Sequence, residues 1–228
     1  MNWIIENLPL IGQRTLEHLA LSIPPIVLSF VLSVPLGWVA NRYRLSRGVL
    51  LTVLGLLYAI PSLPLLIVLP IVLGTGARDS INVVVALTLY GIALMVRTTS
   101  DALGSVSSDI SQSATAMGFS PWTRFWRVDL PLAGPVLLAG IRVVAVSTVS
   151  LVTVGAVLGI KSLGLLFTDG LQRNIVAEVL AGMVATIALA LLIDAALVLL
   201  GRLLMPWARA TRASSTRRSR LTAEAAAS

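Results

Sequence analysis

The chain has 228 residues, of which 57% are hydrophobic and 12% are charged. Soluble globular domains carry about 25% charged residues, so this composition excludes an ordinary soluble enzyme. The apolar content is enough for about five membrane-spanning helices, each of about 20 residues. The chain has no cysteine, which excludes disulfides and thiol chemistry, and its only histidine, His18, excludes a His-rich metal site. We therefore expect an all-α, polytopic membrane protein without a metal site.

Residues 1–17 contain Glu6, Arg14 and Glu17 and lack the basic start and small-residue cleavage site of a signal peptide. We interpret them as a short amphipathic or irregular lead-in. Five apolar runs follow that we interpret as membrane spans. They cover residues 19–40, 49–73, 81–96, 132–158 and 176–204.

The second run, residues 49–73, contains Pro61, Pro64 and Pro70. Proline removes a backbone donor and kinks a helix, and in lipid the freed carbonyl needs protein or water as a partner. Two full spans would need more residues than this run supplies, so we predict one kinked span. Ser62 follows the break at Pro61, and broken helices often mark transport sites.

The basic residues are divided unequally between the two sides of a five-span bundle. The larger group comprises Arg42, Arg44, Arg47, Arg97, Arg124, Arg127, Arg142, Arg202, Arg209, Arg212, Arg217, Arg218 and Arg220. The smaller group is Arg14, Arg78, Lys161 and Arg173. By the positive-inside rule, the N-terminus lies outside, and residues 97–131 and the C-terminal tail lie in the cytoplasm.

The polar stretch of residues 97–131 has the pattern of a folded element. Residues 108–118 are expected to form a short helix with Ser108 as its N-cap and Asp109 in its first turn. Gly118 suits the left-handed position that follows a helix C-terminus. The segment is therefore predicted to be a protruding structure rather than a flexible loop.

A second short helix is expected after Gly118, because Ser120 is a suitable N-cap and Pro121 a suitable first helical residue. Its aromatic residues share one face at helical spacing and need a surface to pack against. They are Trp122, Phe125 and Trp126. Pro131 is expected to end this element and to begin the next span.

At this point the chain resembles the permeases of ATP-binding-cassette (ABC) importers, whose cytoplasmic loop reads Glu-Ala-Ala, three residues, Gly, and later Leu-Pro. The matching residues are Ala114, Gly118, Ser120, Pro121, Trp122, Arg124, Phe125, Arg127, Val128, Leu130 and Pro131. The first two motif positions are Gln112 and Ser113 here, in place of Glu and Ala.

The likeness extends to the osmoprotectant branch, which imports glycine betaine, choline and carnitine. The residues that carry it are Ile60 to Leu63, Ile92 to Thr99, Ala139 to Arg142, Gly155, Gly159, Leu163, Gly164, Gly170, Leu171, Asn174, Gly182 and Asp194. The outer loop departs from this branch at Lys161 and Ser162, where glycines are common, and Pro64 is an additional proline.

The resemblance implies the type I ABC importer fold and a complex with two ATP-binding subunits, a second permease chain (identical or related) and an extracytoplasmic solute-binding protein. It implies that a coupling loop at about residues 107–131 docks on the ATPase. Its contacts would come from Gln112, Ser113, Ala114, Gly118, Phe119, Pro121, Trp122, Leu130 and Pro131. ATP and Mg²⁺ would belong to the partner, since this chain lacks the G-x-x-x-x-G-K-[ST] phosphate loop.

Two further groups of residues are candidates for function. A quaternary ammonium solute can lie over Tyr58, Tyr90 or Phe30 by cation–π attraction, although aromatic residues in spans more often serve packing. Arg142 and Asp194 are the most deeply placed charges, at similar depth in the fourth and fifth spans. They are expected either to pair, to face a common cavity, or to extend to the inner interface.

Residues 1–207 are predicted to be one transmembrane permease domain, and residues 208–228 a basic, disordered tail that anionic lipid headgroups attract. The tail has no aromatic residues between its arginines, which argues against nucleic-acid binding. The protein is expected in the cytoplasmic (inner) membrane of a prokaryote.

Three alternatives remain at this stage. The first alternative is that a permease of the same architecture transports an amino acid or another small solute. A self-sufficient channel or secondary carrier would leave the folded loop unexplained and lacks intramembrane Asp, Glu and His chains. A membrane enzyme has no paired acid and base, because Asp194 is the only deep carboxylate.

Overall fold

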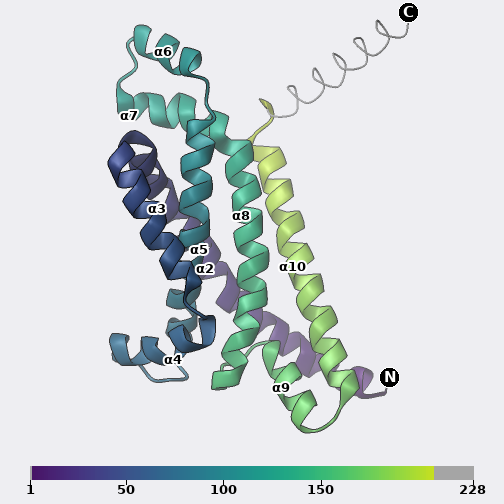
Figure 1. Ribbon diagram of the computed structural model, residues 1–228. Coiled ribbons are helices and arrows are strands. Elements are labelled where there is room, and N and C mark those ends of the chain that lie inside the picture. The colour runs from purple at the N-terminus through teal and green to yellow at the C-terminus, as the bar shows by residue number, and fades with distance from the viewer. Residues whose placement is uncertain (1, 208–228) are drawn as a thin grey trace, which may run out of the picture.

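The computed structural model describes residues 2–207, and every regular element in this range is helical (Figure 1). The elements are α1 (Asn2–Glu6), α2 (Leu8–Arg42), α3 (Arg44–Ala59), α4 (Ser62–Leu73), α5 (Ser80–Gly104), α6 (Ser108–Ala116), α7 (Pro121–Arg124), a π-helical segment (Phe125–Asp129), α8 (Leu130–Val152), a 3-10 segment (Thr153–Leu158), α9 (Gly164–Gln172) and α10 (Val176–Leu204). The predicted tail, residues 208–228, lies outside the described residues.

Four helical units in residues 2–207 are long and apolar enough to cross a membrane: α2, α5, the continuous unit Pro121–Leu158, and α10. Helices α3 and α4 are separated by a short break at which the chain bends by 102°. They form a fifth unit if the pair is counted as one broken span. The predicted all-α, polytopic fold is confirmed. The fifth predicted span coincides with α10, and the second corresponds to the sharply bent pair.

The N-terminal lead-in differs from the prediction. Helix α2 begins at Leu8 rather than near Leu19 and runs unbroken to Arg42. The charges that we read as a boundary are accommodated on the helix surface, because Arg14 Nη1 lies 2.8 Å from Glu17 Oε2 one turn away. An ion pair at this spacing supports a helix and does not end it.

The predicted end of the third span is also wrong. Helix α5 continues to Gly104, so the first part of the polar stretch 97–131 is helical and belongs to the third span. Pro131 lies in the first turn of α8, as expected for the start of the next span, but no break in the helix precedes it. Helix α7, the π-helical segment and α8 therefore form one unbroken helical unit.

The bundle is closely packed through small residues where α2, α5 and α8 meet. A Cβ atom on Gly91 of α5 would lie 2.6 Å from Cβ of Ser29 in α2. A Cβ atom on Gly140 of α8 would lie 2.5 Å from Cγ2 of Thr98 in α5. Small residues at such contacts let helix backbones approach each other in lipid, where hydrophobic attraction between helices is weak.

Figure 1 places α6 and α7 at one end of the bundle, with the C-terminal ends of α2, α5 and α10. Helices α4 and α9 lie at the opposite end, with the N-terminus. The segment between α5 and α8 thus protrudes from one end of a membrane-sized bundle.

Candidate functional site: the segment between α5 and α8

Helix α6 has a defined start and a defined end. Its N-cap is Ser107 rather than the predicted Ser108, since Ser107 Oγ accepts a hydrogen bond from the backbone N–H of Asp109 at 3.3 Å. At the other end, Gly118 has a φ of 86°, the left-handed conformation that the sequence predicted. The N–H of Phe119 donates to the Ala114 carbonyl at 3.2 Å. This pattern is a Schellman motif, which closes a helix and turns the chain sharply.

Helix α7 begins as the sequence predicted. Ser120 Oγ accepts a hydrogen bond from the Thr123 N–H at 3.3 Å, and Pro121 is the first helical residue. In the next turn, the N–H of Leu130 donates to the carbonyl of Phe125, the spacing of a π-helix. Such local widening inside a helix is frequent at functional sites.

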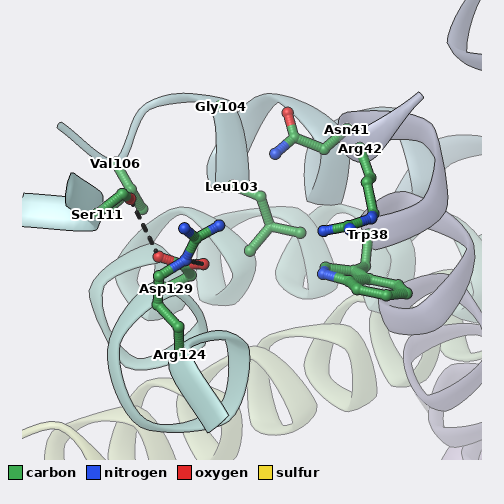
Figure 2. A pocket seen from close by; sticks show the side chains of 9 residues that line it. All are labelled: Trp38, Asn41, Arg42, Leu103, Gly104, Val106, Ser111, Arg124 and Asp129. Carbon is green, nitrogen blue, oxygen red and sulfur yellow. Dashed lines mark hydrogen bonds and ion pairs between the residues drawn. The ribbon is translucent and has the colours of Figure 1, made fainter. Parts of the chain in front are cut away.

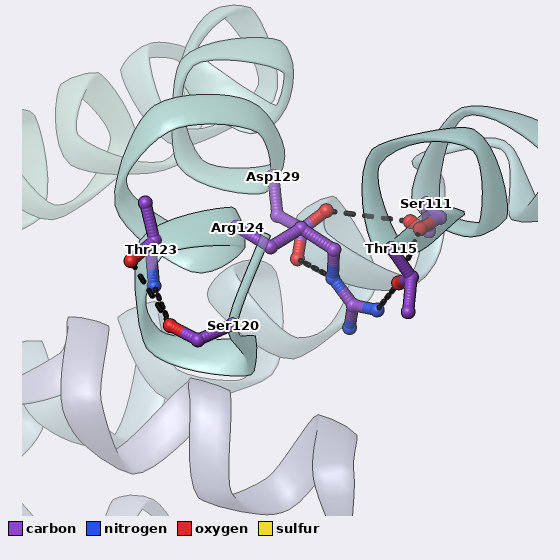
Figure 3. A network of polar contacts seen from close by, with 6 residues as sticks. All are labelled: Ser111, Thr115, Ser120, Thr123, Arg124 and Asp129. Atoms are coloured by element: carbon purple, nitrogen blue, oxygen red, sulfur yellow. Dashed lines mark hydrogen bonds and ion pairs between the residues drawn. The ribbon is translucent and has the colours of Figure 1, made fainter. Parts of the chain in front are cut away.

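A polar network fixes α6 against α7 and the π-helical segment (Figure 3). Arg124 lies between the two helices, with Nε 3.2 Å from Asp129 Oδ2 and Nη1 3.2 Å from Thr115 Oγ1. Ser111 Oγ donates to Asp129 Oδ1 at 3.3 Å. The two short helices therefore form one folded unit. Ser111, Thr115 and Asp129 were not predicted from the sequence, because Arg124 and Asp129 are five residues apart and helical side chains pair at three or four.

The predicted aromatic face has a partner from another helix. Phe125 is 3% exposed, and its ring centroid lies 5.1 Å from that of Trp126 and 5.7 Å from that of Trp38 in α2. Trp38 also contacts Trp122 edge-on, at 6.3 Å between centroids. Trp122 nevertheless remains 61% exposed. The aromatic residues thus connect the protruding segment to the end of α2 while leaving one indole at the surface.

The residues predicted to contact the ATPase fall into three groups by exposure. Exposed positions on the protruding segment are Gln112, Ser113, Gly118, Pro121 and Trp122. Phe119, Leu130 and Pro131 are half-buried. Ala114 is only 2% exposed, so packing inside this chain already requires a small residue there.

The three predicted pathway residues meet at the break between α3 and α4. The rings of Tyr58 and Tyr90 are nearly perpendicular, at 82°, with centroids 5.7 Å apart. The Tyr90 hydroxyl donates to the carbonyl of Ile60 at 2.6 Å, which satisfies a backbone acceptor at the end of α3. Ser62 is the first residue of α4, directly after Pro61.

The structure also brings Arg142 and Asp194 together. Nε and Nη2 of Arg142 in α8 lie 2.6 and 2.8 Å from the two carboxylate oxygens of Asp194 in α10. This parallel, two-bond geometry is the strongest form of an Arg–carboxylate pair. Among residues 2–207, no group of three or more His, Asp or Glu side chains is placed to bind a metal ion.

Residues 2–207 form a bundle of four or five candidate membrane-spanning units with a folded segment at one end, which is the architecture of a multi-pass membrane protein. Residues 29–210 match the family described as "Binding-protein-dependent transport system inner membrane component". The match covers most of the chain, and the chain belongs to this family. It is accordingly the multi-pass inner-membrane component of a transport system and not an enzyme.

Two relatives make the likeness more specific. The chain is 29% identical over 193 residues to the choline transport system permease protein OpuBB of Bacillus subtilis, covering 85% of this chain and 88% of that protein. It is 30% identical over 195 residues to the glycine betaine/carnitine/choline transport system permease protein OpuCD of the same organism, covering 85% and 84%.

The fold matches a chain of the MetNI methionine ABC transporter in an inward-facing form, with a TM-score of 0.77 and 22% identity over 86% of this chain and 97% of that one. The predicted type I ABC importer permease fold is therefore confirmed. The resemblance that the protruding segment first indicated is confirmed as well.

Proposed function

We propose that this permease forms the translocation pathway of an ATP-driven importer for a quaternary ammonium osmoprotectant such as glycine betaine, choline or carnitine. The observation that carries the proposal is the likeness, over 85% of the chain, to permeases whose names specify these solutes. The fold neighbours add the architecture only and do not bear on the solute.

Tyr58, Tyr90 and Ser62 are proposed to form the solute site. Tyr58 is 45% exposed, so its ring can offer a face to a trimethylammonium group, which is attracted to ring faces within about 6 Å. Tyr90 is 4% exposed and holds the Tyr58 ring edge-on at 82°. The 102° bend beside them interrupts the helical hydrogen bonds. Backbone of this kind is tolerated at membrane depth where it is buried in protein or lines a wet cavity.

The segment between α5 and α8 is proposed to dock in a groove of the ATP-binding subunit, which holds ATP and Mg²⁺. The exposed residues Gln112, Ser113 and Trp122 would provide the contact surface, with Ala114 and Gly118 shaping it from within. A displacement of the docked segment would pass directly to α8, because α7, the π-helical segment and α8 are continuous. ATP binding would thereby favour one of two global states.

The orientation follows from the distribution of charge. Arg42, Arg47, Arg124 and Arg202 lie at the end of the bundle that carries α6 and α7. We propose that this end faces the cytoplasm, with the N-terminus and α9 outside, where a solute-binding protein delivers substrate. A second permease chain completes the pathway, and residues 1–207 act as one domain.

The pair of Arg142 and Asp194 is proposed to hold α10 in register with α8. Charges inside a membrane-spanning bundle are retained when they pair or face water, and this pair joins the two last spans of the chain.

The function is tested by reconstituting the permease into liposomes with its ATPase and solute-binding protein and measuring ATP-dependent uptake. We expect uptake of labelled glycine betaine, choline or carnitine, and weaker uptake in Tyr58→Leu than in Tyr58→Phe, because only phenylalanine keeps an aromatic face. Uptake of an amino acid with none of the quaternary ammonium solutes would contradict the proposal.

A further inference from the structure

A polar cavity of about 440 Å³ lies where α2 and α5 end against the protruding segment. Figure 2 shows the side chains that line it. The main ones are Trp38, Asn41 and Arg42 of α2, Leu103 of α5, and Arg124 and Asp129 of the segment. The guanidinium groups of Arg42 and Arg124 lie on opposite sides of Leu103. No part of the coupling mechanism proposed above uses this cavity.

The cavity lining carries an excess of positive charge. Arg124 is neutralised by Asp129, with Nε 3.2 Å from Oδ2. Arg42 forms no ion pair with any residue in the described range, 2–207. Its guanidinium carbon instead lies 5.7 Å from the ring centroid of Trp38 and 5.9 Å from that of Tyr43. Arg42, which is held by aromatic rings and has no carboxylate partner in the part of the chain that the structure describes, thus adds one uncompensated positive charge to the cavity lining, so the lining suits a ligand with a single negative charge.

The surface of α2 below the cavity is apolar and exposed. Counting back from Arg42 by four and three residues in turn gives Trp38, Pro35, Val31 and Leu28, which share one face of the helix. Val31 is 57% and Leu28 43% exposed. A cationic cavity therefore continues into an apolar stripe that runs along a membrane-spanning helix.

We propose that this cavity binds the phosphodiester of an anionic glycerophospholipid, whose acyl chains follow the stripe on α2. A phosphodiester carries the one negative charge that the lining lacks, and an arginine fork matches its oxygens. Basic pockets between helices on the cytoplasmic side of a membrane are typical sites for anionic headgroups. The exposed indole of Trp122 at the same end suits headgroup depth. The proposal rests on the proposed function only for placing this end at the cytoplasmic surface.

The test uses the full chain purified in detergent and titrated with phosphatidylglycerol or phosphatidylcholine, with bound lipid counted by native mass spectrometry. We expect retention of phosphatidylglycerol and not of phosphatidylcholine. Arg42→Gln should weaken lipid retention about fivefold, because each arginine near an anionic headgroup contributes about 1 kcal/mol to binding. Arg42→Lys should retain the lipid, because it keeps the charge. Arg97→Gln is the matched control, since Arg97 is an exposed arginine of α5 outside the cavity.

Three outcomes would overturn the lipid site. They are equal retention of both lipids, unchanged retention in Arg42→Gln, and an equal loss in Arg97→Gln, which would indicate general surface charge. Displacement of the lipid by inorganic phosphate alone would also contradict the proposal, because the acyl chains on α2 should keep the lipid bound. The measurement needs neither ATPase nor solute, so its failure is distinguishable from a failure of the proposed transport function.

Discussion

Substitution of Gly118 tests the shape of the protruding segment most sharply. Gly118 has a φ of 86°, and its N–H donates to the Thr115 carbonyl at 3.0 Å. A Cβ atom there would meet nothing within 4 Å, so any cost of Gly118→Ala comes from backbone conformation and not from a clash. Gly118→Asn is the matched control, because asparagine adopts the left-handed region more readily than other residues with a side chain.

The expected magnitudes differ between the variants. A left-handed conformation costs an ordinary L-residue roughly 1–2 kcal/mol. If docking requires this conformation, Gly118→Ala lowers the affinity for the ATPase by up to about 5–30-fold. Gly118→Pro cannot form the turn at all, since proline fixes φ near about −65° and has no N–H for the Thr115 carbonyl.

The assay measures binding of the purified ATP-binding subunit to each permease variant and solute uptake in proteoliposomes. Affinity and uptake should fall in the order Gly, Asn, Ala, Pro, with no uptake for Gly118→Pro and normal membrane insertion throughout. If Gly118→Pro binds the ATPase as wild type does and still transports, the proposed docking role of this turn is wrong.

Substitutions at three other places in the fold have defined outcomes. Ala114→Leu overpacks a position that is 2% exposed, so it should destabilise the segment by about 1–3 kcal/mol and reduce ATPase binding without affecting insertion. Arg142→Asp and Asp194→Arg should each impair assembly and uptake, and the double exchange should recover part of both; a double variant no better than the singles would show that the pair is unimportant. Tyr90→Phe leaves the Ile60 carbonyl without its donor and should lower the free energy of unfolding in detergent by about 1–3 kcal/mol, whereas an unchanged unfolding midpoint would argue against that bond.

The elements that were predictable from the sequence are those set by local chemistry. Helix α10 was delimited correctly because a long apolar run begins after Arg173 and Asn174. The turn at Gly118 and the cap at Ser120 were also readable, because single residues with special backbone or side-chain preferences determine them.

The features that escaped prediction depend on neighbours in three dimensions. The start of α2 at Leu8 was missed because charged residues suggested a boundary, whereas Arg14 and Glu17 pair on the helix surface. Trp38 was missed because its contacts with Trp122 and Phe125 join segments far apart in the chain.

The π-helical segment Phe125–Asp129 has no sequence pattern of its own, and it joins α7 to α8 without the break that was expected before Pro131. The pair of Arg142 and Asp194 was named as one of several alternatives, because periodicity gives the depth of a charge but not the direction it faces.

The central claim is that the segment between α5 and α8 is held by the ATP-binding subunit, and cross-linking tests it most directly. Since the chain has no cysteine, Gln112→Cys introduces a unique attachment point for a photo-activated cross-linker on exposed α6. Gln172→Cys, at an exposed position in the last turn of α9 at the opposite end, is the control. In membranes containing the complete transporter, the ATP-binding subunit should cross-link to position 112 and not to position 172. Cross-linking from position 172, or labelling of position 112 by an impermeant reagent from outside intact cells, would contradict the claim.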